Sequence, residues 1–252
     1  MEKGVIDLIL VPSGLLVMVI YHFWLLRRVL KHPTKTTIAV NEISRRLWVE
    51  TMMEDIPRHG VLAVQSLRNN IMASTLLATA AISLSSLLAI LMVGSGGGNY
   101  GGYYHKGETK SLVSKAYGDR ISDYILSLKF FAMLLCFLLS FMFNVQSIRY
   151  YNQASILINV PYKKVPSPTP TRSLRLGMLN VTKIFNKGSY FWSLGWRAIY
   201  FSFPLFMWLL GPIPMFVSCI VLVFILYFLD STFDYGWQGG DNNEVHKNYN
   251  VC

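Results

Sequence analysis

Charged residues are scarce in this chain. Only 14% of its 252 residues are charged, whereas 53% are hydrophobic, and ordinary soluble domains carry about 25% charged residues. The charges lie in blocks between long apolar runs, which excludes a typical soluble domain and indicates an integral membrane protein. Basic residues outnumber acidic ones by 23 to 13. Because the basic residues flank the apolar runs instead of forming one cationic face, we expect no nucleic-acid binding.

Cysteine and histidine are too few and too scattered to suggest a disulfide framework or a metal site. The three cysteines stand at positions 136, 219 and 252, and the five histidines share no metal-ligand spacing. The glycine-rich stretch GSGGGNYGG is not followed by the GK[ST] sequence of a phosphate-binding loop. No nucleophile and base can be paired. We therefore expect no enzyme activity, no metal and no cofactor.

Four apolar runs have the length of a membrane span. They cover about residues 5–26, 71–93, 125–145 and 198–229, and a spanning helix needs about 20 residues. The fourth run is too long for one straight crossing and contains Gly211-Pro212-Ile213-Pro214. We expect one span kinked at this break, with a re-entrant pair of segments as the less favoured alternative. The sequence thus predicts an all-α, four-span membrane domain over residues 1–235 and a polar, flexible tail over 236–252.

Lysine and arginine residues orient these spans. The loops 27–70 and 146–197 carry eight each, against four in residues 94–124 and one in each terminal tail. The positive-inside rule then predicts that both basic loops are cytosolic and both termini lumenal or extracellular. Residues 38–56 read as a cytosolic helix with a Glu42–Arg46 pair at i, i+4. We therefore expect helical extensions on the cytosolic side of the bundle.

Hydroxyl residues gather on one face of the second span. At 100° per residue this face carries Thr75, Thr79, Ser83 and Ser86. The face either packs against another helix or lines a water-filled pore, and on its own it favours packing. Arg68 continues the face at the cytosolic end, where its charge opposes cation flow unless the pore widens there or Arg68 pairs with Glu50 or Glu54. These three charged residues are therefore candidates for the cytosolic mouth.

Three carboxylates are expected at the opposite, far-side surface. Asp7 lies in the first span, and Asp230 and Asp234 close the fourth. A carboxylate within a membrane needs water, a partner or a cation, and a ring of carboxylates around an oligomer axis concentrates cations. Asp7 is the preferred candidate for cation selection. Since four helices of one subunit do not readily enclose a conduit, a pore here implies several subunits.

Two stretches resemble a known family. WVETMMEDIPRHGVLAVQSLRNNIMASTLLATAAISL and YFSFPLFMWLLGPIPMFVSCIVLVFILYFLD resemble a plant membrane-protein family catalogued as domain of unknown function 599. LRNNIMASTLLAT and GPIPMF are the most specific strings, and the resemblance covers about residues 5–235. A further likeness to WeiTsing-like channels implies a homopentameric, calcium-permeable cation channel of the endoplasmic reticulum with a role in plant immunity.

The sequence therefore predicts a homo-oligomeric ring around a central cation pathway. The second span is the first choice for the pore lining, and the first span is the alternative. The expected partners are further copies of the chain, membrane lipid and permeant cations such as calcium. The endoplasmic reticulum is favoured over the plasma membrane through the resemblance. The alternative functions are a non-conducting membrane scaffold whose basic loops bind partners, and a small transporter.

Overall fold

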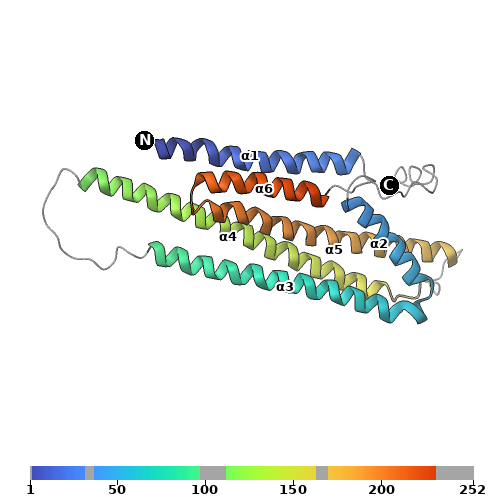
Figure 1. Ribbon diagram of the computed structural model, residues 1–252. Helices are drawn as coiled ribbons and strands as arrows, with labels where there is room; N and C mark the ends of the chain where they lie inside the picture. Colours follow the sequence, from blue (N-terminus) through green and yellow to red (C-terminus); the bar gives the residue numbers. More distant parts are fainter. Residues whose placement is uncertain (1, 32–36, 97–111, 163–169, 231–252) are drawn as a thin grey trace.

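The computed structural model describes residues 2–31, 37–96, 112–162 and 170–230, and every regular element in these ranges is a helix. The six helices are α1 (Glu2–Lys31), α2 (Thr37–Glu54), α3 (Ile56–Gly96), α4 (Leu112–Leu157), α5 (Pro170–Met207) and α6 (Pro212–Asp230). Figure 1 shows five of them running side by side along one axis, while the shorter α2 crosses the bundle at one end. The all-α class is confirmed. The predicted tail, 236–252, lies outside the described residues.

Four helices have the length and composition of membrane spans, as expected of an integral membrane protein. The candidate spans are Ile9–Val29, Ile56–Met92, Tyr124–Leu157 and Pro212–Asp230. With 41 and 46 residues, α3 and α4 extend about 60 and 70 Å at 1.5 Å per residue. The hydrocarbon core is only about 30 Å thick. Both helices therefore continue well beyond a bilayer. The predicted helical segment 38–56 falls mostly in α2, which ends at Glu54, while Ile56 begins α3.

The fourth apolar run is an antiparallel pair of helices and not one kinked span. The chain turns over residues 208–211, after which α6 runs back along α5 (Figure 1). Gly211 has a φ of 148°, a backbone region that favours glycine. Pro212 begins α6, where its missing N–H leaves no hydrogen bond unmade. The expectation of a kink is therefore wrong, because the Gly-Pro break ends one helix and starts another.

Lys129 of α4 holds this turn in place. Its Nζ donates a hydrogen bond of 2.9 Å to the Trp208 carbonyl and lies 5.0 Å from the centroid of the Trp208 ring. The last carbonyls of a helix have no partner within the helix and carry partial negative charge. An ammonium group at the end of α5 satisfies one of these carbonyls, so the α5–α6 turn is tied to α4.

The reversal brings the end of α6 back toward α2. Figure 1 shows the start of α1 and the end of α6 directed toward opposite ends of the bundle. The expectation of both termini on one side of the membrane depends on an even number of crossings. The four helices with the composition of membrane spans do not include α5, so the side on which each terminus lies stays a prediction.

Small and polar residues let α4 and α5 approach closely. Ser140 Oγ donates to the Gly195 carbonyl at 2.9 Å, and Ser147 Oγ donates to the Gly188 carbonyl at 2.8 Å. A Cβ atom on Gly195 would overlap the Asn144 side chain. In lipid, where apolar surface gives little driving force between helices, such close contacts and hydrogen bonds hold helices together. This polar seam makes α4 and α5 the centre of the fold.

Candidate functional site

The predicted pore-lining residues form an outward-facing row on α3. All four are exposed in the single subunit: Thr75, Thr79, Ser83 and Ser86. Thr75 donates to the Ile71 carbonyl at 2.9 Å, Thr79 to the Thr75 carbonyl at 2.8 Å, and Ser86 to the Ile82 carbonyl at 3.0 Å. These hydroxyl donors are thus satisfied within α3. The oxygen lone pairs are left as acceptors on the outer surface.

The other hydroxyls of α3 serve the packing of the subunit. Ser74 is buried, with its Oγ 3.3 Å from Ser147 Oγ of α4. Ser85 is also buried and donates to the Ala81 carbonyl at 2.9 Å. The two faces of α3 therefore differ. Ser74 and Ser85 belong to the buried face, which packs inside the subunit. The outward row is exposed and does not take part in this packing.

Glu50, one of the charged residues expected at the cytosolic mouth, pairs within its own helix. Arg68 is exposed on α3, whereas Glu50 pairs with Arg46 at 3.1 Å. The expected Arg68–Glu50 pair is therefore absent from the described residues, and Glu54 lies exposed at the end of α2. The expected Glu42–Arg46 pair is also replaced, because Glu42 accepts a 2.6 Å hydrogen bond from Tyr190 of α5.

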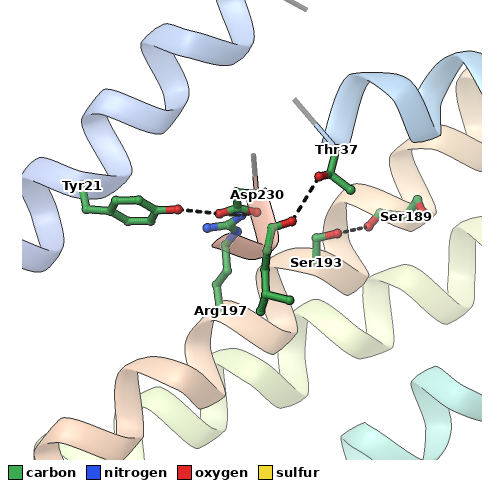
Figure 2. A network of polar contacts seen from close by, with 7 residues as sticks. Tyr21, Thr37, Ser189, Ser193, Arg197 and Asp230 are labelled. Carbon is green, nitrogen blue, oxygen red and sulfur yellow. Dashed lines mark hydrogen bonds and ion pairs between the residues drawn. The ribbon is translucent and has the colours of Figure 1, made fainter. Parts of the chain in front are cut away.

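Asp230 is not a free carboxylate. Nη2 of Arg197 donates to its two oxygens at 2.8 and 2.9 Å, and Tyr21 Oη of α1 donates to Oδ2 at 2.8 Å (Figure 2). The Arg197 and Asp230 side chains are only 16% and 12% exposed. A carboxylate neutralised in this way adds no net negative charge to a selectivity ring, and it lies at the α2-bearing end. The pairing therefore does not favour Asp230 as a cation site, and its place on the far side of the membrane stays a prediction.

The two other candidate carboxylates lie outside the described side chains. Asp7 belongs to the first turns of α1, but its side chain is not among those described. Asp234 lies beyond the described residues. Both remain predictions from the sequence.

A small polar cavity lies beside the Arg197–Asp230 pair. It has a volume of about 140 Å³, and side chains of α2, α5 and α6 line it: Thr37, Ile38, Asn41, Arg45, Ser189, Tyr190, Ser193, Arg197 and Asp230. Figure 2 shows Thr37, Ser193 and Arg197 converging on this region from α2 and α5. Thr37 Oγ1 also donates to the Leu229 carbonyl at 3.1 Å. The cavity therefore lies where the first turn of α2 meets the end of α6.

Guanidinium donors exceed the carboxylates that face them in this cavity. Arg45 Nε donates to Asn186 Oδ1 at 2.7 Å, and Arg45 forms no ion pair within the described ranges. Burial lowers the pKa of Arg45 because desolvation disfavours the charged form. Nη1 of Arg197 is buried and has no hydrogen-bond partner among the described residues. We call this cavity, with the lining given above, the Arg45–Arg197 cavity. Its guanidinium groups can accept an anion.

A family model described as protein of unknown function, DUF599, matches residues 9–235. The chain belongs to the DUF599 family. The match includes the outward row of α3, the α5–α6 turn and the Arg45–Arg197 cavity. No curated protein and no solved structure matches the chain. Membership of the DUF599 family confirms the resemblance noted in the sequence, and the function rests on the sites themselves.

The sequence of this DUF599 protein did contain a signal for the cavity. Arg197 and Asp230 bracket an apolar run, and ionisable residues at such positions normally find a partner. The expected kinked span separates them by the thickness of the membrane, so the sequence alone does not predict that they pair. Arg45 carried no signal of its own, because its place beside α5 depends on how α2 folds back over the bundle.

Proposed function

We propose that this DUF599 protein assembles as a homo-oligomeric, calcium-permeable cation channel of the endoplasmic reticulum, pentameric as the family resemblance implies. The observation that carries the proposal is the outward row on α3, Thr75, Thr79, Ser83 and Ser86, which the subunit leaves exposed. Several copies arranged with this face toward a common axis would remove it from lipid and form a polar conduit.

The hydroxyl geometry supports cations over anions. Thr75, Thr79 and Ser86 each direct their hydrogen toward a carbonyl of α3, so their lone pairs point away from the helix. Rings of such oxygens can replace part of the hydration shell of a cation, whereas an anion would need donors. The row therefore favours the ion class that the sequence predicts.

The fold also supports a revised orientation. We place the α2-bearing end in the cytosol because the basic segments 27–70 and 146–197 gather there. The C-terminal part of α5 then crosses the membrane beside α6 and makes a fifth crossing. In this orientation Arg68 lies toward the cytosol, and Asp7 at the lumenal mouth remains the candidate for cation selection.

Recordings from purified protein in planar bilayers test the proposal. We expect discrete single-channel currents and a lower unitary conductance for Thr75→Val/Thr79→Val, because valine keeps the shape but removes the hydroxyl. Thr51→Val is the matched control, since Thr51 makes the same bond to the carbonyl four residues earlier but lies on α2. Absence of currents in repeated preparations would favour a scaffold. Saturable flux without unitary steps would favour a transporter.

Ion substitution tests the selectivity residue separately. Asp7→Asn should lower calcium permeability relative to monovalent cations, because a ring of carboxylates attracts divalent ions most strongly. Asp230→Asn should leave that ratio unchanged, since Arg197 already neutralises Asp230. An unchanged ratio in Asp7→Asn would remove Asp7 from the selectivity mechanism.

A further inference from the structure

We propose that the Arg45–Arg197 cavity binds a phosphate group with free terminal oxygens, either the headgroup of phosphatidic acid or soluble inorganic phosphate. This inference goes beyond ion conduction and does not depend on it. The cavity lies between α2, α5 and α6, so a bound phosphate would connect all three helices.

The cavity lining holds two guanidinium groups, Arg45 and Arg197, and the carboxylate of Asp230. Arg197 is paired with Asp230. Glu42 lies outside the lining, where it accepts hydrogen bonds from the neutral donors Tyr190 at 2.6 Å and Asn186 at 3.3 Å, and its charge also acts on Arg45. Arg45 forms no ion pair within the described ranges, although it is partly buried. A partly buried guanidinium without a direct carboxylate contact is stabilised by an anion whose oxygens accept its hydrogen bonds.

The available donors suit phosphate oxygens. Arg45 uses Nε for Asn186, which leaves its two terminal nitrogens for a bidentate contact of the kind that arginine makes with phosphate. Nη1 of Arg197 is buried without a partner in the described part of the chain, so an oxygen within reach would satisfy it. Asn41 and Ser193 add an amide and a hydroxyl to the lining. Their side chains can contact further phosphate oxygens.

The position and size of the cavity fit a headgroup phosphate. The cavity lies where α6, a candidate membrane span, ends at Asp230. Aromatic side chains of α5, which mark membrane interfaces, are found at the same level: Tyr190, Trp192 and Trp196. A volume of about 140 Å³ equals about four or five water molecules at about 30 Å³ each. One phosphate group fits such a space while the rest of a lipid stays outside.

Thermal unfolding in lipid nanodiscs tests the proposal. The full chain is placed in phosphatidylcholine nanodiscs that contain either phosphatidic acid or the same fraction of phosphatidylserine, and inorganic phosphate is titrated into pure phosphatidylcholine nanodiscs. We expect phosphatidic acid to raise the Tm of the wild-type protein more than phosphatidylserine does. A rise with inorganic phosphate alone would identify soluble phosphate as the ligand.

Variants then locate the site. Arg45→Gln should abolish the rise in Tm or increase the half-saturating concentration about tenfold or more, as expected for loss of hydrogen bonds to a charged group. Arg45→Lys should keep part of the effect, because lysine keeps the charge but lacks the two terminal nitrogens that make a bidentate contact. Arg149→Gln, an exposed arginine outside the cavity, is the matched control and should behave as wild type.

Two results would overturn the proposal. One is that neither phosphatidic acid nor inorganic phosphate raises the Tm of the wild-type protein above the phosphatidylserine control. The other is an undiminished response in Arg45→Gln. If Arg45→Gln does not fold, Ser193→Leu is measured in its place, because it fills the cavity and keeps both arginines. An undiminished response in Ser193→Leu would equally overturn the proposal.

Discussion

The ion pair between Arg197 and Asp230 gives a direct test of the α5–α6 reversal. Asp230→Asn keeps the shape of the side chain but leaves the Arg197 charge, only 16% exposed, without its partner. Removing one member of a buried pair costs about 3–5 kcal/mol. Since both side chains retain some exposure, we expect about 2–3 kcal/mol for either Asp230→Asn or Arg197→Gln. The double variant removes both charges, so it should be less destabilised than the sum by about 1.5–2 kcal/mol.

Equilibrium unfolding in mixed micelles measures these differences, with the fluorescence of the six tryptophans as the signal. Arg46→Gln is the control, because Arg46 and Glu50 are 43% and 39% exposed and such pairs contribute at most about 1 kcal/mol. In one kinked span, residues 197 and 230 would lie on opposite membrane surfaces and could not interact. Strictly additive effects of the two substitutions would therefore refute the reversal and restore the kinked span.

Two further substitutions test the contacts that position α5. Gly195→Ala should destabilise the fold by about 1–3 kcal/mol, since its Cβ would overlap Asn144. In an Asn144→Ala background the same substitution should destabilise the fold less. An equal loss in both backgrounds would mean that Asn144 does not clash with the added Cβ. Lys129→Met should lower the free energy of unfolding by about 1.5–3 kcal/mol, because the hydrogen bond to the Trp208 carbonyl is lost. The control Lys183→Met changes an exposed lysine and should stay within about 0.5 kcal/mol of wild type. Equal effects of the two substitutions would show that the Lys129–Trp208 bond does not stabilise the fold.

Three of the spans could be predicted because their apolar runs are continuous. The runs at 5–26, 71–93 and 125–145 fall inside α1, α3 and α4. Hydropathy did not show how far α3 and α4 continue, because their outer turns are amphipathic and pack on other helices instead of lipid. Leu67 of α3 and Ala154 of α4, for example, are buried in one cluster that also includes Met53 of α2. Their helical state depends on these tertiary contacts.

The reversal at Gly211 could not be predicted for a different reason. A Gly-Pro break is compatible both with a kink and with a tight turn, and hydropathy is the same in either case. Three long-range contacts decide between them. Lys129 binds the end of α5, Arg197 pairs with Asp230, and Thr37 binds the Leu229 carbonyl. The local sequence around these residues does not identify their partners, so only the assembled bundle shows the turn.

The hydroxyls of α3 show the limit of periodicity as a guide to function. The pattern identified a polar face but not its neighbour. The fold separates Ser74 and Ser85, which are buried in the subunit, from the outward row that includes Thr75 and Thr79. Ser74 is buried because α4 presents Ser147 to it, and no property of α3 alone encodes that partner. The outward row has no such counterpart in the described part of the chain, so its role depends on what surrounds the subunit. In the assembly that we propose, further copies turned toward a shared axis would give these oxygens water and cations instead of lipid.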